Sequence, residues 1–548
     1  MNGATWVVRA LQKIGVRYVF ALCGNGLHSF LASCRDEGLT VIDCHNEQAA
    51  AFMADGWGRL TGTLGVVAVS SGPGFTNTIT GTANAFWDGS PMLFISGASS
   101  ELTKGLEHFQ EMDQERMVEP ICKYAARVTH GEQIPHQFQR AVAAAVQGRP
   151  GPVHLTITDN AFADEITSDT YLAKLTPEAG QVNPQGWGDP LSIASAVELI
   201  KEAKRPLLIA GSGLFYSHGA DALAQFARRT DIPVLTPMWD RGPVEEPLRQ
   251  YIGITDPEAN PAYSFLEQCD LLINVGARFD YRLNYLQDCP QDMKIIHIHH
   301  DAAELNRGYI SDVAILGSPA VVIKQLAAAL SEGPIHSQWL DEIIAFRAQA
   351  LAKWFSMKDD DRMPMRTARL VLELAPFLED DKTVFVIDGG NIGRWAQMLL
   401  FNRCRGKWIT CGTSGVIGHG IPVAMAAKLA FPDHKVLLLT GDGSFGFTPL
   451  ELWNAYKKKL PFTAVIAADG AWGIVADKQP PHARFATEFG PIPFYALAEA
   501  LQGKGILIEK PEEIKKAVAA GLADDRVTVI QVPCEQGGID IITQNLSS

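Results

Sequence analysis

Short, almost continuously apolar segments rich in β-branched residues alternate with longer stretches of helical periodicity along the whole chain. Segments such as Leu64–Val69, Leu271–Val275 and Lys435–Leu439 are predicted to be buried strands. Amphipathic stretches such as Gln48–Leu60 and Leu450–Lys459 are predicted to be helices. Strands that are apolar on both faces and separated by helices indicate parallel sheets covered by helices, so the predicted fold class is α/β. Further predicted strands are Met92–Ile95, Val153–Ile157, Pro206–Ile209, Lys294–Ile298, Val384–Ile387 and Thr463–Ile466.

Two polar segments divide this pattern into three parts. Thr176–Pro190 is rich in proline and glycine, and Lys353–Met365 contains a run of three aspartates. A chain of 548 residues is too long for one hydrophobic core, because domains usually contain about 150 residues. We therefore predict three domains, at residues 1–175, 185–345 and 360–548, each with a parallel sheet covered by helices.

Composition and charge exclude several classes of protein. Apolar residues make up 47% of the chain and charged residues 20%, as in an ordinary folded globular protein. The formal net charge is −14 and no block of lysine and arginine occurs, which disfavours nucleic acid as a partner. No apolar run approaches ~20 residues and the N-terminus has no leader pattern, so we expect no membrane partner. The nine cysteines lack metal-ligand or redox spacing, and we predict reduced thiols in a cytoplasmic protein.

Two Asp-Gly pairs follow predicted strands in the last third of the chain. Residues 441–444 are Gly-Asp-Gly-Ser, and residues 468–473 are Ala-Asp-Gly-Ala-Trp-Gly, so that Asp469 lies 27 positions after Asp442. Neighbouring parallel strands would place both carboxylates at one edge of a sheet. Two carboxylates, a backbone carbonyl and phosphate oxygens are a typical ligand set for Mg²⁺. One Asp-Gly pair alone is usually a turn, but two pairs after buried strands favour a metal site.

This arrangement resembles the cofactor motif of thiamine-diphosphate-dependent enzymes, in which Gly-Asp-Gly is followed by a spacer of similar length and Asn-Asn. The resemblance covers essentially the whole chain and is greatest to the branch of acetolactate synthase, benzaldehyde lyase and 2-hydroxyacyl-CoA lyase. It implies a pyrimidine-binding domain, a central domain and a diphosphate- and Mg-binding domain, in this order. The implied metal ligands are Asp442, the side chain of Asp469 and the carbonyl of Ala471. The chain departs from the family pattern because Ala468 and Asp469 replace the usual Asn-Asn, which adds a negative charge.

The N-terminal third contains a second family mark. Residues 45–48, His-Asn-Glu-Gln, follow the predicted strand Thr40–Cys44 and begin a predicted helix. They resemble the family's His-Glu-Gln helix start, which implies that Glu47 hydrogen-bonds the aminopyrimidine ring of the cofactor. A carboxyl group shielded from water can share a proton with the ring and favour the imino form that activates the thiazolium carbon. For an isolated glutamate in a first helical turn, the helix dipole would be a sufficient explanation.

Further segments resemble family loops near the cofactor. Residues 71–77 resemble a turn beside the cofactor, and residues 388–391 resemble a loop whose bare N–H groups face the diphosphate. Residues 414–420 resemble the segment whose bulky apolar residue, here Ile417, supports the bent cofactor. The predicted cofactor-binding residues are Glu47, Gly74, Asn77, Gly390, Asn391, Gly415, Ile417, Gly441, Asp442, Gly443, Ser444, Asp469, Ala471, Trp472 and Gly473.

The candidate catalytic residues are Glu47, Gln110, Asn25 and His419. Gln110 lies in a Phe-Gln-Glu stretch that resembles the family's substrate side, and Asn25 occupies a position where relatives carry a variable active-site residue. His419 is included because of its loop, although a lone histidine is more often a satisfied polar group than a base.

The resemblance implies an enzyme that forms or cleaves a carbon–carbon bond adjacent to a carbonyl, with thiamine diphosphate and Mg²⁺ as cofactors. Expected substrates are 2-oxo acids, aldehydes or 2-hydroxy ketones, as for an acetolactate synthase-like or benzaldehyde lyase-like enzyme. A 2-oxo acid decarboxylase and a 2-hydroxyacyl-CoA lyase are alternatives in the same family. A non-catalytic regulatory member is favoured only by the altered pair at 468–469, and a nicotinamide-dependent oxidoreductase lacks its full glycine motif.

Two further properties depend on the resemblance. A homodimer or homotetramer with the active site at the subunit interface is expected, because Glu47 and Asp442 lie on domains that meet across subunits in the family. The Gly-Ser-Gly at residues 211–213 is a weak dinucleotide signal and leaves open whether FAD or an adenine nucleotide binds the central domain.

Overall fold

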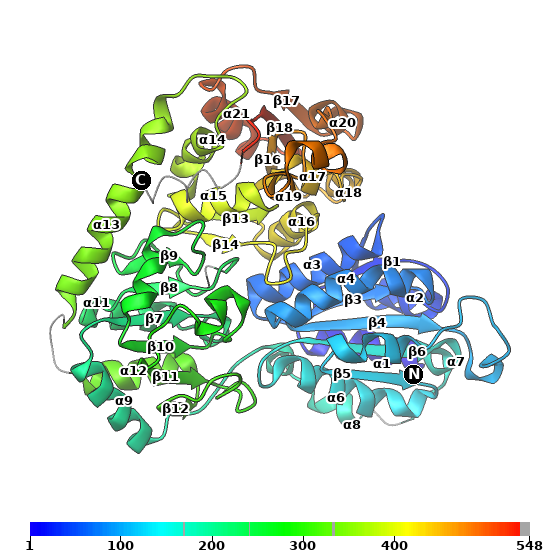
Figure 1. The fold of residues 1–548 in the computed structure, drawn as a ribbon. Helices are drawn as coiled ribbons and strands as arrows, with labels where there is room; N and C mark the ends of the chain where they lie inside the picture. Colours follow the sequence, from blue (N-terminus) through cyan, green and yellow to red (C-terminus); the bar gives the residue numbers. More distant parts are fainter. Residues whose placement is uncertain (168–169, 241, 331–334, 538–548) are drawn as a thin grey trace. The chain divides into compact units, whose positions relative to one another are not determined.

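The computed structural model describes residues 1–167, 170–240, 242–330 and 335–537. Over this part of the chain there are three sheets of six strands each, and every strand pairing is parallel (Figure 1). Helices cover these sheets, which confirms the predicted α/β class. None of the helices in the described ranges is long and apolar enough to cross a membrane.

The chain forms two compact units. The first contains Met1–Asn183 together with Ile421–Pro432 and Thr448–Pro461, and the second contains the other described residues from Pro184 onward. The first unit holds the first sheet, and the second unit holds the other two.

The first sheet has the strand order β2-β1-β3-β4-β6-β5. Its strands are β1 (Tyr18–Leu22), β2 (Thr40–Asp43), β3 (Gly65–Val69), β4 (Met92–Ala98), β5 (Tyr124–Val128) and β6 (Pro152–Thr158). The helices of this unit are α1 (Gly3–Lys13), α2 (His28–Glu37), α3 (Glu47–Thr61), α4 (Pro73–Asp88), α5 (Gln114–Val118), α6 (Ile134–Val146), α7 (Asp159–Ala163), α8 (Thr170–Lys174), α16 (Gly420–Ala430) from Ile421 onward, and α18 (Glu451–Lys457).

Helices lie on both faces of the first sheet, with α3 and α4 on one face and α1 and α6 on the other (Figure 1). This explains why all five residues of β3 are buried. Gly65 permits a close approach of β3 to α3, because a Cβ atom there would lie 2.0 Å from the carbonyl oxygen of Ala54. The helix that carries Glu47 is therefore fixed against the sheet by backbone packing.

The second sheet has the order β12-β11-β10-β7-β8-β9 and the third β14-β13-β15-β16-β18-β17. The strands of the second sheet are β7 (Pro206–Ala210), β8 (Val234–Thr236), β9 (Tyr251–Ile254), β10 (Leu271–Val275), β11 (Lys294–His299) and β12 (Val313–Leu316). Those of the third are β13 (Thr383–Asp388), β14 (Lys407–Ile409), β15 (Lys435–Gly441), β16 (Thr463–Ala468), β17 (Lys504–Leu507) and β18 (Thr528–Pro533). The helices of this unit are α9 (Pro190–Glu202), α10 (Ser212–Tyr216), α11 (Ala220–Thr230), α12 (Pro319–Ala329), α13 (Ser337–Phe355), α14 (Thr367–Leu374), α15 (Asn391–Leu400), α17 (Asp442–Phe445), α19 (Gly473–Ala476), α20 (Phe494–Ala500) and α21 (Glu513–Leu522).

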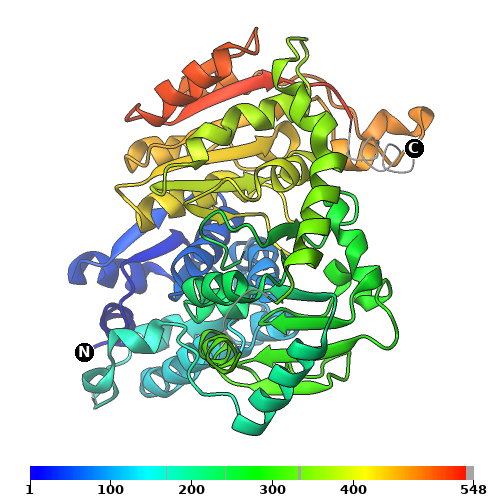
Figure 2. The same cartoon turned by 90° about the vertical axis from the view of Figure 1, so that its left-hand side faces the viewer.

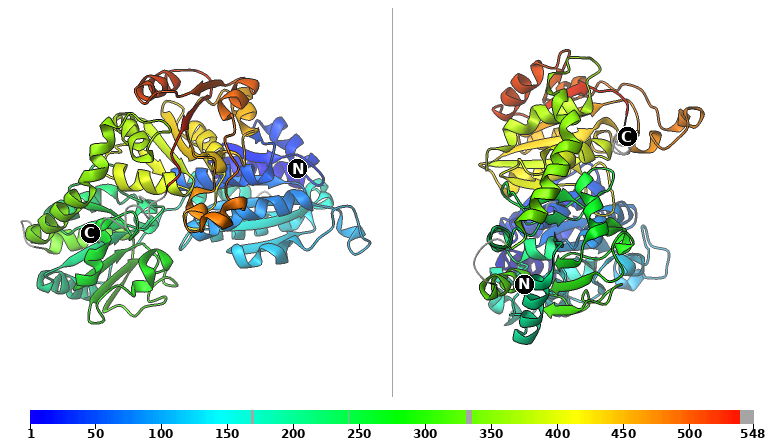
Figure 3. Two further views of the ribbon diagram at one scale, coloured as in Figure 1. Left: turned by 45° about the horizontal axis from the view of Figure 1, so that its top comes forward. Right: turned by 60° about the vertical axis from the view of Figure 1, so that its left-hand side comes forward.

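Helix α13 joins the two sheets of the second unit (Figure 2). Near its start, Trp339 packs edge-on against Phe265 of the second-sheet region at 5.3 Å between ring centroids. Near its end, Trp354 packs against Trp395 of α15 beside the third sheet at 4.8 Å. Figure 3 shows the third sheet, coloured yellow to red, from two further directions.

The predicted strands are present, most of them longer than expected by one to three residues. The segment Lys353–Met365, which the sequence suggests as a boundary, overlaps the end of α13, because this helix continues to Phe355. Trp354 is buried in the core around the third sheet, and this packing outweighs the polarity of the neighbouring residues.

Candidate functional site

Two candidate aspartates lie at the same edge of the third sheet. β15 and β16 are hydrogen-bonded neighbours, with Gly441 opposite Ala467. Asp442 follows β15 directly and Asp469 follows β16 directly. The expectation that both carboxylates lie at the same edge of a parallel sheet is thus confirmed. Their role as metal ligands remains a prediction.

Asp442 is held by backbone groups from both strand ends. Its side chain is 2% exposed. Its Oδ1 accepts a hydrogen bond from the N–H of Gly443 at 2.8 Å, and its Oδ2 accepts one from the N–H of Gly470 at 2.8 Å. Burial raises the pKa of Asp442, while these donors partly offset the effect. The carboxylate therefore links the two loops in a fixed orientation.

Asp469 lies in a strongly perturbed electrostatic environment. Burial, followed by the charge of Asp442, raises the pKa of Asp469 to about 7. Its Oδ1 accepts the N–H of Ala471 at 3.1 Å. The buried carboxylate of Asp442 and the half-buried one of Asp469 oppose each other's charge at this strand edge, and a divalent cation would relieve the repulsion. Among the described residues no group of three or more His, Cys, Asp or Glu side chains could hold a metal, so a complete shell needs carbonyl, water or ligand oxygens.

A pocket of about 450 Å³ opens at this edge of the third sheet. It brings together most of the candidate residues from the C-terminal third. Those that line it are Gly390, Asn391, Gly415, Ile417, Gly441, Asp442, Gly443, Ser444, Asp469, Ala471, Trp472 and Gly473. Four loops distant in sequence therefore meet at one cavity.

Two glycines of this pocket allow neighbouring side chains to pack directly against the backbone, and a third faces open space. A Cβ atom at Gly390 would lie 2.9 Å from the side chain of Ile474, and one at Gly443 would lie 2.6 Å from the ring of Trp472. At Gly441 an added Cβ would meet nothing within 4 Å, so this position faces open space. A pocket lined by two carboxylates suits an anionic group only when a cation accompanies it. The pocket thus fits a diphosphate with a divalent ion.

The sequence did not reveal every residue of this pocket. The additional lining residues are Thr367, Gly389, Ile392, Phe447, Ala467, Ile474, Val475, Cys534 and Gly537. Cys534 directly follows β18, the neighbour of β16, so the strand order would have indicated it. Asp477 was missed as well: its Oδ2 accepts a hydrogen bond from Nδ2 of Asn391 at 2.8 Å, and no motif indicated this pair.

His419 is placed behind the pocket rather than in it. Its side chain is fully buried, with Nδ1 3.4 Å from Oδ1 of Asp388. Oδ2 of Asp388 accepts the N–H groups of Gly418 at 3.1 Å and Gly420 at 2.9 Å. Asp388 therefore fixes the loop that carries Ile417. The structure does not bring His419 to the residues that line the pocket.

Glu47 forms a second group of candidate residues, in the first unit. Asn46 is the N-cap of α3, its side chain accepting the N–H of Gln48, and Glu47 is the first helical residue. Oε2 of the half-buried Glu47 accepts a hydrogen bond from Nδ2 of Asn77 at 3.0 Å. A Cβ atom at Gly74 would lie 3.3 Å from Oε1 of Glu47, so the glycine leaves space at that oxygen. Glu47, Gly74 and Asn77 are thus brought together.

Asn25 and Gln110 are joined through Ser71. Nδ2 of Asn25 donates to Oγ of Ser71 at 3.2 Å, and this hydroxyl donates to Oε1 of Gln110 at 3.3 Å. Gln110 adopts a left-handed backbone conformation with φ of 62°, which is costly for a residue with a side chain. The two candidate substrate-side residues therefore belong to one hydrogen-bonded chain that the sequence did not show.

Glu451 is a further residue that sequence reasoning missed. It lies on α18 and is 1% exposed. Its Oε1 accepts the N–H of His45 at 2.8 Å, two residues before Glu47, and its Oε2 accepts Nδ2 of Asn454 at 2.7 Å. Burial raises the pKa of Glu451. The start of α3 is thereby fixed by a carboxylate more than four hundred residues away in sequence.

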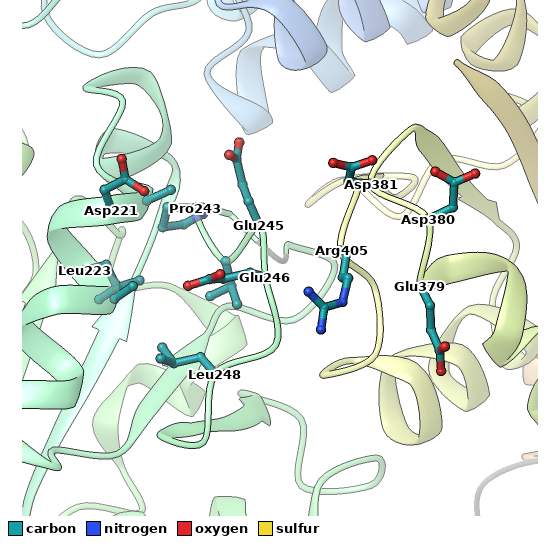
Figure 4. Close-up of a pocket in the computed structure, with 13 residues that line it drawn as sticks. Asp221, Leu223, Pro243, Glu245, Glu246, Leu248, Glu379, Asp380, Asp381 and Arg405 are labelled. Atoms are coloured by element: carbon teal, nitrogen blue, oxygen red, sulfur yellow. The ribbon is translucent and has the colours of Figure 1, made fainter. Parts of the chain in front are cut away.

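A larger cavity, of about 710 Å³, lies elsewhere in the second unit (Figure 4). Its acidic lining residues are Asp221, Glu245, Glu246, Glu379, Asp380 and Asp381, and Arg405 lies between the two groups of acids. Some of these charges are already paired, such as Glu246 with Arg228 at 2.5 Å and Asp380 with Lys435 at 3.2 Å. No candidate residue from the sequence lines this cavity.

Three successive parts of the chain match the three domains of one enzyme family. Residues 1–117 match the model "Thiamine pyrophosphate enzyme, N-terminal TPP binding domain", residues 193–326 the central domain of the same enzymes, and residues 388–532 their C-terminal TPP binding domain.

Similar proteins include the "Probable acetolactate synthase large subunit" of Methanocaldococcus jannaschii, with 30% identity over 97% of this chain and 92% of that protein. "Acetolactate synthase large subunit IlvG" of Mycobacterium tuberculosis is 31% identical over 97% of this chain and 95% of that protein. Human "2-hydroxyacyl-CoA lyase 2" is 27% identical over 93% of this chain and 86% of that protein.

Proposed function

This chain belongs to the thiamine pyrophosphate enzyme family, and we propose that it uses thiamine diphosphate together with Mg²⁺ to form or cleave a carbon–carbon bond next to a carbonyl. The observation that carries the proposal is the glycine-rich pocket with two neighbouring carboxylates, of Asp442 and Asp469, at the ends of β15 and β16. Its chemistry suits a diphosphate and a divalent cation, as argued above.

In this proposal the pocket holds the cofactor's charged end. Asp442, Asp469 and the carbonyl oxygen of Ala471 would hold Mg²⁺, and its charge would offset the mutual repulsion of the carboxylates. The loop at Gly390 and Asn391 would offer backbone N–H groups to the diphosphate when it is bound. Ile417, on the loop fixed by Asp388, supports the bent shape of the bound molecule.

Glu47 is proposed to exchange a proton with the aminopyrimidine ring. Nδ2 of Asn77 donates to Oε2 of Glu47, which leaves Oε1 to hold or release the proton on the side where Gly74 has no side chain. When bound, thiamine diphosphate supplies the carbon nucleophile and the electron sink for the carbonyl carbon. Asn25 and Gln110, linked through Ser71, are proposed to orient the substrate.

The proposed substrates are 2-oxo acids, aldehydes or 2-hydroxy ketones, as for an acetolactate synthase-like or benzaldehyde lyase-like enzyme. The similar proteins named acetolactate synthase favour the first of these. A 2-hydroxyacyl-CoA lyase is the second candidate, because the human relative carries that name. Purified protein with thiamine diphosphate and Mg²⁺ should be assayed with pyruvate, benzoin, glyoxylate and a 2-hydroxyacyl-CoA. Turnover of one class identifies the substrate, and no turnover of any would contradict the proposed activity.

The active assembly is proposed to be a cytoplasmic homodimer or homotetramer, with Glu47 of one subunit serving the pocket around Asp442 of another. Large exposed apolar side chains near Gln110 support an interface, because such a cluster is unusual on a surface that stays in water. These are Leu102, Leu106 and Phe109, which are 90%, 73% and 70% exposed. The domain boundaries at 1–175, 185–345 and 360–548 likewise remain a proposal.

A further inference from the structure

A buried amide connects the interior of the first sheet to the turn beside Glu47. Gln114 is the first residue of α5 and is 1% exposed. Its Oε1 accepts the N–H of Gly72 at 3.2 Å. Its Nε2 donates to Oγ of Ser96 at 2.8 Å, to the carbonyl oxygen of Gly97 at 3.2 Å and to Oγ1 of Thr156 at 3.3 Å.

Two of these partners fix the orientation of the amide. A backbone N–H can only donate and a backbone carbonyl can only accept, so Oε1 must face Gly72 and Nε2 must face Gly97. Ser96 is held in turn by Nε2 of the fully buried His154 at 2.8 Å. The Gln114 side chain is therefore held in one orientation by residues of β4 and β6, with its Oε1 directed at the turn.

The turn that Gln114 holds carries the candidate residues of the first unit. Gly72 adopts φ of 64° and precedes α4, which carries Gly74 and Asn77, the neighbours of Glu47. A Cβ atom at Gly72 would lie 2.7 Å from Cβ of Gln110, so the turn is in close contact with the substrate-side residue. A displacement of Gly72 would move both groups.

We propose that Gln114 is a positioning residue, which sets the turn at Gly72 and through it the geometry of Asn77 and Gln110 around Glu47. Gln114 itself touches neither Glu47 nor Gln110 through a hydrogen bond in the described structure. The inference that Gln114 affects turnover rests on the proposed function. The hydrogen bonds of Gln114 are observed whether or not that function is correct. Misplacement of catalytic groups by about 1 Å is enough to lower turnover strongly.

The test compares three variants of the full-length protein. Gln114→Met keeps the length of the side chain but removes both the acceptor for Gly72 and the donors to β4. Ser96→Ala removes one partner and leaves the bond between Gln114 and Gly72. Phe138→Leu lowers stability in the core of the same unit, where Phe138 packs against Trp6 at 5.7 Å, without touching this network.

We expect Gln114→Met to lower kcat per folded protein by about 10- to 100-fold with little change in KM, and to increase hydrogen exchange of residues 70–78. Ser96→Ala should change kcat by less than about threefold, because Gly97 still holds the amide. Phe138→Leu should lower Tm with kcat unchanged.

Wild-type kcat and wild-type exchange in Gln114→Met would overturn the positioning role. Loss of kcat equally in Gln114→Met and Phe138→Leu would also overturn it, because general destabilisation would then suffice. If the wild-type protein shows no turnover dependent on thiamine diphosphate, the proposed function fails instead. Exchange of residues 70–78 then decides the positioning role alone.

Discussion

Replacement of Glu47 by glutamine distinguishes a role of this side chain in proton transfer from a role in stabilising the fold. The side chain is half-buried and receives one hydrogen bond, from Nδ2 of Asn77. A glutamine can present its own oxygen to Asn77, so Glu47→Gln should change the free energy of unfolding by no more than about 1 kcal/mol. The amide cannot hold the exchanged proton. We expect turnover to fall by about 100- to 10,000-fold, which corresponds to about 3–5 kcal/mol in activation free energy.

The assay is steady-state turnover with thiamine diphosphate and Mg²⁺, alongside a titration of cofactor binding and a thermal melt. Asn77→Ala is the matched control, because it removes the hydrogen-bond donor and retains the carboxylate. It should lower turnover by about tenfold or less. Wild-type turnover in Glu47→Gln would refute the proton-transfer role. Loss of cofactor binding with turnover per bound cofactor intact would show that Glu47 acts only in binding.

Three further predictions follow from the structure and the family. Asp469→Asn should retain Mg²⁺ with moderately changed affinity, whereas Asp469→Ala should bind it much more weakly; equal Mg²⁺ titrations for Asp469→Ala and wild type would exclude Asp469 as a ligand. Sedimentation should show the active species to be at least a dimer, and a fully active monomer would refute the shared site. Burial lowers the pKa of His154 to about 3, so stability present above pH 6.5 should fall as the pH drops toward 3; His154→Gln should flatten this dependence in thermal melts, and an unchanged slope would contradict it.

The fold class was predictable because the apolar pattern of the strands in the sequence agrees with their burial in the folded protein. Fully buried strands such as β3 and β10 read as continuous apolar runs, and parallel sheets covered by helices are the arrangement that buries such runs on both faces. The end of α13 was not predictable. Trp354 is buried in a core assembled from several elements, in which Trp395 of another helix lies against it.

The pocket at the ends of β15 and β16 was predictable because its residues follow strand ends in recognisable motifs. Gly441–Ser444 and Asp469–Gly473 lie at the ends of neighbouring strands, and strand order alone brings them together. The sequence could not predict residues that act through contacts at long range. Glu451 reaches His45, and Gln114 reaches Gly72, through pairings that no local pattern encodes.

His419 shows the opposite limitation. It lies on the same loop as Ile417, one residue before α16 begins at Gly420. Its nearness in sequence to this predicted cofactor-binding residue suggested a catalytic role. The loop turns between the two residues, so Ile417 lines the pocket while His419 is fully buried against Asp388. The direction of a side chain in an irregular loop is set by hydrogen bonds such as those of Asp388, which the sequence does not show.

We propose that Asp442 and the pocket around it hold thiamine diphosphate through a divalent cation. Isothermal titration of thiamine diphosphate into the metal-free protein, with and without Mg²⁺, tests it most directly, with Asp442→Ala as the variant and a thermal melt to confirm that the variant is folded. We expect tight binding of thiamine diphosphate to the wild-type protein only with Mg²⁺, and no binding to folded Asp442→Ala. Binding of equal strength without Mg²⁺, or in the folded variant, would contradict it.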